Sequence, residues 1–221
     1  MKFDIIYRYE ADNRPARPQP SDSNAALCRL CDGNHAFASL FDATSNGADR
    51  AQMIVRVDPR DVGLSTSDSR TPSQRPFAAV LGCADARVPI ELIFNEGPND
   101  LFVLRVAGNG LGAEVLGSLH YAIDHLGDSL RLIVVLGHSG CGAVTTAVDV
   151  FLEPANYLTL ATQHSLRGIV DHLLGVVQAS SKRLVTSLDP MSPNIRDSGR
   201  RWSKHRLQPM RHLPRTRSSR S

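Results

Sequence analysis

Three residues of types that commonly bind metal ions follow two apolar runs of this 221-residue chain. Cys83 comes shortly after the run 77–81, and His138 and Cys141 follow the run 132–136. The His-x-x-Cys spacing lets one turn direct an imidazole and a thiolate toward a common point. Cys83, from a neighbouring strand, completes a set of two sulfurs and one nitrogen, which favours zinc.

The number of ligands indicates what a zinc ion would do here. A structural zinc site normally has four protein ligands, whereas a catalytic site has three and leaves one position for water. No fourth cysteine or histidine adjoins Cys83 or the segment 138–141. Buried cysteines at strand ends are often only small apolar residues, so the prediction depends on the three residues together. The sequence predicts an open zinc site in a hydrolytic or hydrating enzyme.

Asp85 and Arg87 lie on the loop that begins at Cys83. Because they are two residues apart, their side chains can lean to the same side and form a charge-assisted pair. The alternative is an exposed ion pair that contributes little to stability. We favour the functional interpretation, an oriented carboxylate beside the metal, because the pair shares the loop of a ligand.

Short apolar runs that alternate with a helical pattern must position these residues. The runs 77–81, 101–104 and 132–136 predict strands buried on both faces of a sheet. Apolar residues at helical spacing over 115–126 predict a helix, which Gly127 ends. This alternation predicts parallel strands, with ligands beyond their carboxyl ends. The predicted fold is α/β, with a central, mainly parallel β-sheet flanked by helices and an N-terminal helical arm.

The residues before this sheet predict a helix from Asn24 that Gly33 caps, a second short helix over 37–41, and a strand over 51–57. Cys28 and Cys31 have metal-like spacing, but they lie in the predicted helix and lack a partner pair elsewhere. We therefore expect helix packing at these two cysteines and no metal site.

Composition divides the chain into three parts. Residues 1–23, with a proline-rich stretch, predict an N-terminal extension, and residues 24–180 predict the α/β domain. Residues 181–221 form a basic tail without apolar periodicity, which we expect to be disordered. A basic tail can bind nucleic acid, but this one lacks interleaved aromatic residues and a recognisable fold, so nucleic acid is not an expected partner.

The first residues carry charges and lack the apolar core of a secretory signal. No later apolar run is long enough to cross a bilayer. We therefore expect a cytoplasmic protein without a membrane partner. In that compartment thiols stay reduced, so the four cysteines indicate chemistry or burial more than disulfides.

Three ordered motifs identify the family that the chain resembles. C-x-D-x-R-V at 83–88, R-x-A-G-N at 105–109 and H-S-x-C-G-A at 138–143 together resemble the β-class carbonic anhydrases. The resemblance extends from about residue 30 to residue 150 and then thins, where family members usually continue into helices and a further strand. Ala86 stands where the family commonly has serine, which removes a hydroxyl without changing a ligand.

The resemblance implies a carbonate dehydratase, a zinc enzyme that reversibly hydrates carbon dioxide to bicarbonate and a proton. It implies that Cys83, His138 and Cys141 are the zinc ligands. It also implies that Asp85 accepts a hydrogen bond from zinc-bound water and that Arg87 orients Asp85. In this family the aspartate can instead coordinate zinc when its arginine pair breaks, and the sequence leaves that state open.

The resemblance further implies a substrate pocket and a homodimer or higher homo-oligomer. Gln74 would donate a hydrogen bond to an oxygen of bicarbonate or carbon dioxide. Phe102 and Tyr121 would form apolar walls, in that family partly across a dimer interface, and core packing is the alternative for all three residues. His120 and His125 are candidate proton shuttles, although a solvated or structural role is the default for histidines in helical segments.

Two other functions stay open. The atypical C-terminal part is consistent with a truncated or inactive zinc-binding protein of the same fold, whose sheet edge is unpaired. The same fold could also serve a hydrolase of carbonyl sulfide or carbon disulfide, because pocket shape decides that choice.

Overall fold

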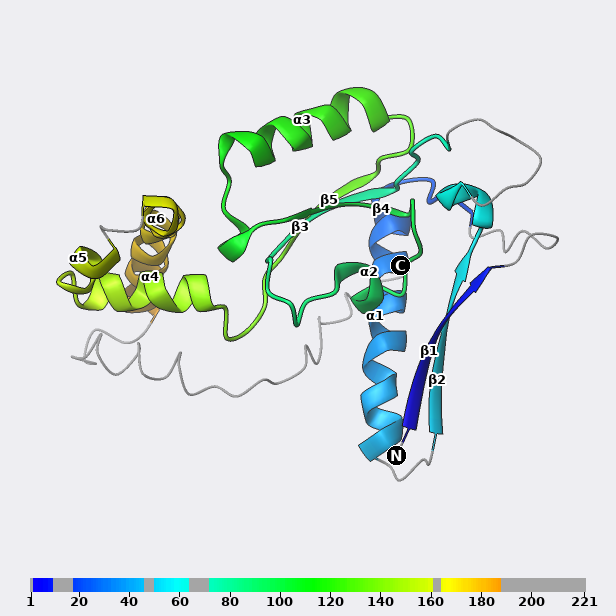
Figure 1. The fold of residues 1–221 in the computed structure, drawn as a ribbon, viewed down its shortest axis with the longest axis horizontal. Coiled ribbons are helices and arrows are strands. Elements are labelled where there is room, and N and C mark those ends of the chain that lie inside the picture. Colours follow the sequence, from blue (N-terminus) through cyan, green and yellow to red (C-terminus); the bar gives the residue numbers. More distant parts are fainter. Residues whose placement is uncertain (1, 10–17, 46–49, 64–71, 161–163, 188–221) are drawn as a thin grey trace, which may run out of the picture. The chain divides into compact units, whose positions relative to one another are not determined.

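The computed structural model describes residues 2–9, 18–45, 50–63, 72–160 and 164–187 (Figure 1). By their contacts the residues fall into two units, Met1–His138 and Ser139–Ser221, and each is described by itself. Within the described residues, no helix has the length and apolarity needed to span a membrane. Residues 188–221 lie outside the described part, so the expectation of a disordered tail stays a prediction.

The first unit contains a three-stranded parallel sheet that carries the predicted strands. Its strands are β3 (Ala78–Gly82), β4 (Leu101–Arg105) and β5 (Leu132–Leu136), in the order β4-β3-β5. Gly82 pairs with both Arg105 and Leu136, so the last residues of all three strands lie in one row. The predicted parallel α/β arrangement is confirmed. The segments that follow β3, β4 and β5 therefore all begin at the carboxyl-terminal end of the sheet.

The three strands differ in burial. The central strand β3 is buried along its whole length, whereas β4 is partly buried. The prediction that β5 is buried on both faces is wrong, because Ile133 is 45% and Val135 66% exposed. Strand β5 packs only its other face, through Leu132, Val134 and Leu136, against the core.

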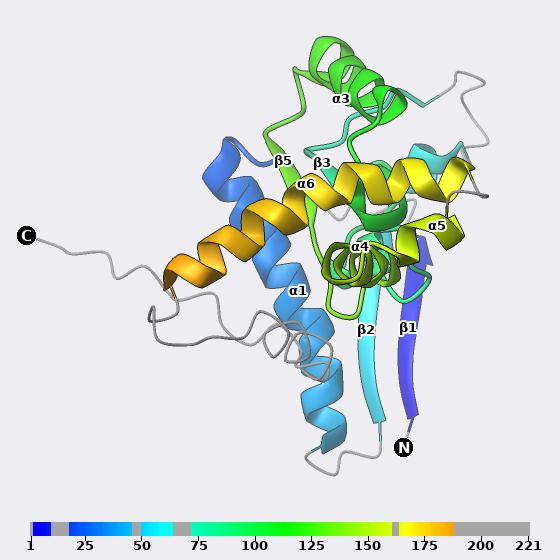
Figure 2. The ribbon, with the colours of Figure 1, turned by 90° about the vertical axis from the view of Figure 1, so that its left-hand side faces the viewer.

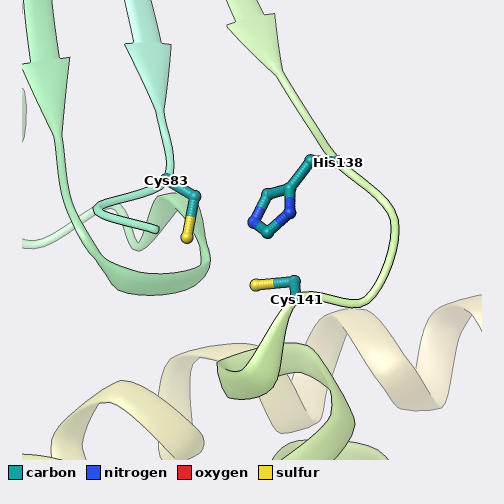
Figure 3. A group of neighbouring side chains, drawn as sticks. All are labelled: Cys83, His138 and Cys141. Atoms are coloured by element: carbon teal, nitrogen blue, oxygen red, sulfur yellow. The ribbon is translucent and has the colours of Figure 1, made fainter. Parts of the chain in front are cut away.

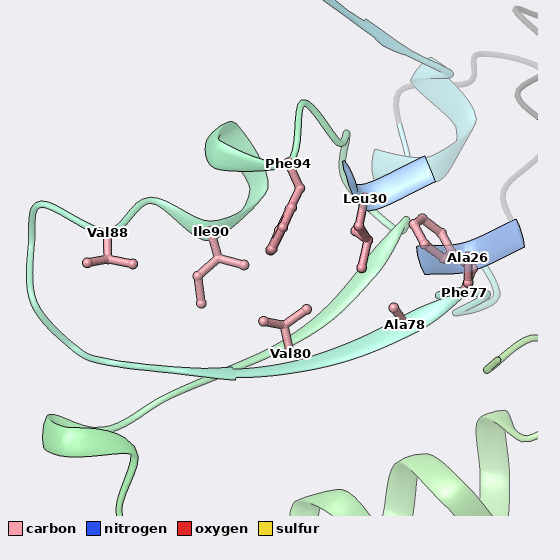
Figure 4. Packing of buried hydrophobic residues seen from close by; sticks show 8 residues of the cluster. All are labelled: Ala26, Leu30, Phe77, Ala78, Val80, Val88, Ile90 and Phe94. Carbon is pink, nitrogen blue, oxygen red and sulfur yellow. The ribbon is translucent and has the colours of Figure 1, made fainter. Parts of the chain in front are cut away.

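One face of this sheet packs against the helices α1 (Ser23–Ser45) and α2 (Ile90–Ile93) (Figure 4). Val80 on β3 faces Ile90 of α2, while Leu30 of α1 lies above Ala78. The full cluster consists of Ala26, Leu30, Phe77, Ala78, Val80, Val88, Ile90 and Phe94. Removing this apolar surface from water is the main force that holds α1 and α2 on the sheet.

Helix α1 is continuous through Gly33, so the prediction of two helices separated by a glycine cap is wrong. A Cβ atom at Gly33 would lie 1.7 Å from the carbonyl oxygen of Phe94. Asn34, the next residue, donates a hydrogen bond from Nδ2 to the carbonyl oxygen of Ile93 at 3.4 Å. Gly33 is therefore needed because the helix passes directly against the backbone that follows α2.

A charged cluster joins α1 to the turn before β4. Arg29 donates from Nε to Oε1 of Glu96 at 2.9 Å and from Nη2 to Asp100 at 2.8 Å. Its guanidinium also lies over the ring of Phe77, 4.3 Å from the centroid. Glu96 is only 1% exposed. A carboxylate this deeply buried requires a cationic partner, so Arg29 fixes α1 to this turn.

The structure has a second, two-stranded sheet, of which the sequence predicted only one strand. Strand β2 (Arg50–Val57) confirms the predicted strand and pairs in parallel with β1 (Lys2–Tyr9), and α1 lies between them in the chain. Residues 2–9 were predicted only as part of an N-terminal extension. Ile5 of β1 instead packs against the buried cluster Leu40, Met53, Val55 and Val57.

The remaining helices also follow the apolar pattern. Helix α3 (Ala113–Leu126) ends where predicted, although Gly127 has a right-handed conformation, with φ −56°, and not the left-handed one of a glycine cap. The described part of the second unit contains α4 (Gly142–Leu152), α5 (Asn156–Leu160) and α6 (His164–Ser187), shown in Figure 2. Ala147 and Val150 of α4 pack against Val170 and Leu173 of α6. Helix α6 continues past residue 180, the predicted end of the domain.

We predict that Gly33→Ala destabilises the chain by about 3 kcal/mol, because the added methyl group cannot fit against the Phe94 carbonyl without moving the backbone. Urea unfolding followed by circular dichroism measures this change. Gly117→Ala in α3 is the matched control, since nothing lies within 4 Å of the added Cβ. That control should stabilise the chain by about 0.5–1 kcal/mol. Equal effects of the two substitutions would contradict the close approach at Gly33.

Candidate metal centre

Cys83 follows the last residue of β3 and is 4% exposed. Its position depends on Gly82, where a Cβ atom would lie 2.5 Å from Cδ1 of Ile90. Because Gly82 has no side chain, the end of β3 can pass close to Ile90 of α2 before the loop that begins at Cys83. The backbone pairing of β3 with β4 continues into this loop, because Val106 donates to the Gly82 carbonyl at 3.0 Å and Ala84 donates to the Val106 carbonyl at 3.3 Å.

His138 and Cys141 lie on the segment that follows β5. Cys141 is 8% exposed and is the N-cap residue of α4. Figure 3 shows the side chains of Cys83, His138 and Cys141 directed toward a common point. Their ligand atoms, two sulfurs and one imidazole nitrogen, all lie within 4.8 Å of one another. Among the described residues, this is the one such group of three or more cysteine, histidine or acidic side chains.

The three side chains fit a zinc ion. A tetrahedral ion with Zn–S bonds of about 2.3 Å and a Zn–N bond of about 2.0 Å places its ligand atoms roughly 3.5–3.8 Å apart. The separations within 4.8 Å are close to that requirement and need only small side-chain movements. Sulfur and imidazole donors together favour zinc over the hard ions that prefer oxygen ligands.

The predicted pair of Asp85 and Arg87 forms on the same loop. Arg87 donates from Nε to Oδ1 of Asp85 at 3.0 Å and from Nη2 to Oδ2 at 2.7 Å. The backbone N–H of Arg87 donates to Oδ1 at 2.9 Å. The Arg87 guanidinium and this N–H hold the pKa of the Asp85 carboxyl far below its usual value. The carboxylate is thus ionised at neutral pH, and its Oδ2 lies 4.0 Å from Nδ1 of His138.

The residues expected to line a substrate pocket are only partly brought together. Phe102 on β4 and Tyr121 on α3 have ring centroids 6.4 Å apart, and the Tyr121 ring stacks on His125 at 4.6 Å. Tyr121 is 46% exposed, so one side of this aromatic group faces solvent. Gln74 is exposed in the segment that precedes β3 and is not a member of this group.

Sequence reasoning assigned no role to three residues that touch the centre. Arg105 donates hydrogen bonds to the carbonyl oxygens of Cys83 and Asp85. Gly108 donates its backbone N–H to Sγ of Cys83, and Asn109 donates to a carbonyl at the end of β5. The available signal was the R-x-A-G-N motif itself, which was recognised as a motif but not linked to the ligands.

Comparisons with known proteins point to one family. The profile of a family described as carbonic anhydrase matches residues 78–203, which is more than half of the chain. The match begins later than the resemblance seen in the motifs. It also continues well beyond residue 150, where the motifs alone had suggested that the resemblance thins.

Individual relatives match shorter stretches. A carbonic anhydrase of Mycolicibacterium smegmatis is 45% identical over 91 residues, which are 41% of this chain and 43% of the relative. Carbonic anhydrase 2 of Mycobacterium tuberculosis is 51% identical over 75 residues, 34% of this chain and 35% of the relative. The chain thus matches less than half of the length of either relative.

Two solved structures complete the comparison. The β-carbonic anhydrase CcaA is 24% identical, with a TM-score of 0.43 over 77% of this chain and 65% of that protein. A tetrameric β-carbonic anhydrase of Sordaria macrospora is 23% identical, with a TM-score of 0.35 over 78% of this chain and 85% of that protein.

We predict that the purified chain binds about one zinc ion and that Cys83→Ser removes it, because the substitution deletes one of two sulfur donors. Elemental analysis of the protein after gel filtration gives the zinc content. Cys28→Ser is the matched control, since Cys28 is an exposed cysteine of α1 outside the group. A Cys83→Ser protein with the zinc content of the unchanged chain would refute this ligand assignment.

Proposed function

This chain belongs to the carbonic anhydrase family, and we propose that it catalyses the zinc-dependent, reversible hydration of carbon dioxide to bicarbonate and a proton. One observation supports the proposal most strongly. The ligand atoms of Cys83, His138 and Cys141 lie within 4.8 Å of one another, beside the carboxylate of Asp85. This arrangement combines a place for one metal ion with an oriented hydrogen-bond acceptor.

Cys83, His138 and Cys141 would hold the zinc, and three protein ligands leave a position for water. Zinc in such an open site lowers the pKa of coordinated water toward neutrality and supplies the nucleophile, a property established for zinc enzymes that include carbonic anhydrases. Two thiolates donate more charge than imidazoles. The zinc would therefore be a weaker Lewis acid than with three imidazoles, and residues of the chain that orient the reactants would matter more.

Asp85 provides that orientation. Because its carboxylate is ionised, it accepts hydrogen bonds and cannot donate them. In the proposed role it would accept a hydrogen bond from the O–H group of the nucleophilic oxygen, so that a lone pair of this oxygen points toward carbon dioxide. Arg87 holds both carboxylate oxygens and thereby fixes the direction from which they accept. Such positioning reduces the entropy lost in reaching the reactive geometry.

The aromatic pair of Phe102 and Tyr121 supports an apolar wall for carbon dioxide, which has no net dipole and makes few polar contacts. Gln74 would donate to a substrate oxygen as negative charge develops there during hydration. His125, stacked on Tyr121, would pass the released proton to buffer from an exposed position. The choice among carbon dioxide, carbonyl sulfide and carbon disulfide depends on this pocket.

We also propose that the chain forms a homodimer or a higher homo-oligomer in the cytoplasm. Helix α3 supports the assembly, because Leu116 and Ile123 are each more than 40% exposed and, seven residues apart, lie on one face of it. Burying such residues against a second copy would remove apolar surface from water.

For the assembly, we predict a mass at least twice that of the 24.1 kDa chain in gel filtration with light scattering. Ile123→Glu should shift the population toward monomer, because it places a charge in the apolar contact. The control is Glu153→Gln, a polar change on the second unit. A monomeric unchanged chain would rule out the proposed oligomer.

For catalysis, we predict that Asp85→Asn lowers kcat/KM for carbon dioxide hydration about 100-fold while the zinc content is unchanged. The amide can no longer accept hydrogen bonds at both positions, and it loses the ion pair with Arg87. Stopped-flow measurement with a pH indicator gives the rate. The control Asp128→Asn changes an exposed aspartate in the turn after α3 and should leave the rate intact.

The same assay separates the proposed function from its alternatives. A zinc-loaded chain without hydration activity would favour an inactive zinc-binding protein. Turnover of carbonyl sulfide or carbon disulfide without turnover of carbon dioxide would favour a hydrolase. Either result would overturn the proposed carbon dioxide hydration.

A further inference from the structure

The turn Arg105–Asn109, between β4 and α3, makes hydrogen bonds to each of the two strands that lead to metal ligands. It lies at the same edge of the sheet as Cys83 and His138, because Gly82, Arg105 and Leu136 share one row of the pairing. Its contacts involve side-chain and backbone donors of Arg105, Gly108 and Asn109. All of these residues belong to the first unit.

Arg105 holds the backbone of the ligand loop. Its Nε donates to the carbonyl oxygen of Cys83 at 3.1 Å, and its Nη2 donates to that of Asp85 at 2.6 Å. One planar guanidinium thus spans the residue that would bind zinc and the residue that would orient the nucleophile. Since a guanidinium presents its donors in a fixed fork, the two carbonyls are held at a set separation.

Gly108 acts on the sulfur of Cys83 directly. Its backbone N–H lies 3.4 Å from Sγ, within hydrogen-bond range for sulfur. The turn that carries this N–H is tight, because Gly108 and Asn109 both adopt left-handed conformations, with φ of 64° and 58°. A donor aimed at a thiolate fixes its orientation and withdraws electron density from it. It therefore offsets part of the charge that two thiolates would place on the metal.

Asn109 fixes the other ligand-bearing strand. Its Nδ2 donates to the carbonyl oxygen of Leu136 at 3.0 Å. Leu136 is the last residue of β5, and His138 follows after one further residue. A left-handed conformation is favourable for asparagine compared with most other residues. The side chain can therefore reach β5 without strain in the turn.

We propose that Arg105, Gly108 and Asn109 are positioning residues that set the geometry and electron density of the metal centre. The proposal rests on the proposed function in taking zinc as the bound ion. In this arrangement the R-x-A-G-N turn holds the backbone carbonyl and the sulfur of Cys83 and the backbone carbonyl of Asp85. It also holds the carbonyl of Leu136, two residues before His138. A loss of any contact loosens a ligand without removing it.

The test compares Arg105→Gln with Arg131→Gln in the full chain. Arg131 is a matched control, because its guanidinium also donates to backbone carbonyls, those of Gly127, Asp128 and Leu130, in a turn that contains no metal ligand. Zinc affinity is measured by competition with a chelator. Absorption of the cobalt-substituted protein reports the thiolate-to-metal charge transfer. Urea unfolding of the metal-free proteins measures the structural cost of each substitution.

We expect Arg105→Gln to weaken zinc binding about 10- to 100-fold and to shift the cobalt charge-transfer bands. Arg131→Gln should keep both properties even if it costs as much stability. Arg105→Lys should restore part of the affinity, because it retains the charge but lacks the fork. In hydration assays of the zinc-loaded protein, kcat should fall while KM stays unchanged, since Arg105 acts on the ligands.

Asn109→Gly provides a second variant, because glycine keeps the left-handed backbone while removing the amide donor. Asn109→Gly should also weaken zinc binding. If Arg105→Gln does not fold, the zinc affinity of Asn109→Gly tests the positioning role instead. Zinc affinity and cobalt spectra equal to those of the unchanged chain would overturn the proposal. Zinc binding that depends on Arg105 in a chain without hydration activity would support the positioning role and reject only the proposed function.

Discussion

The candidate centre depends on the in-register parallel pairing of β3 with both of its neighbours. Gly82, Arg105 and Leu136 lie in one row, and each is followed within a few residues by a group that contributes to the centre. A shift of one residue would move a strand by about 3.3 Å and turn its side chains to the other face of the sheet. The ligand atoms lie within 4.8 Å of one another, so such a shift would separate them.

Packing on one side of the sheet maintains this register. Helix α1 approaches the backbone of Phe94 at Gly33, and α2 approaches Gly82 through Ile90. The contact at Gly33 is with backbone and excludes a side chain there, whereas a side chain at Gly82 would require the end of the Ile90 side chain to shift. The glycines thus let both helices pack closely on the sheet. The ion pair of Arg29 with Glu96 adds a polar constraint on the turn before β4. A buried carboxylate that loses its partner costs several kcal/mol, so alternative packings of α1 are disfavoured.

The sequence was sufficient for the elements whose signals are local. The apolar runs located β3, β4 and β5, and the residues at their ends predicted the grouping of Cys83, His138 and Cys141. Gly33 was misinterpreted because its reason is a contact with Phe94, far away in the chain. Strand β1 was missed although aromatic and aliphatic residues alternate with charged ones, because charges at a chain start also suit an extension. The exposed face of β5 depends on which elements pack over the sheet, and local sequence does not contain that information.

The contacts of Arg105 also bear on how Asp85 behaves. Arg87 is 57% exposed, so solvent and salt screen its attraction to Asp85, and its hold depends on the geometry of its hydrogen bonds. Arg105 donates a hydrogen bond to the backbone carbonyl of Asp85. With the backbone of Asp85 held in this way, its carboxylate changes position mainly by rotation of the Asp85 side chain away from Arg87. If Asp85 has the proposed role, its choice between orienting a nucleophile and turning toward the metal would depend mainly on the rotamer of its own side chain, because hydrogen bonds hold the backbone of this loop.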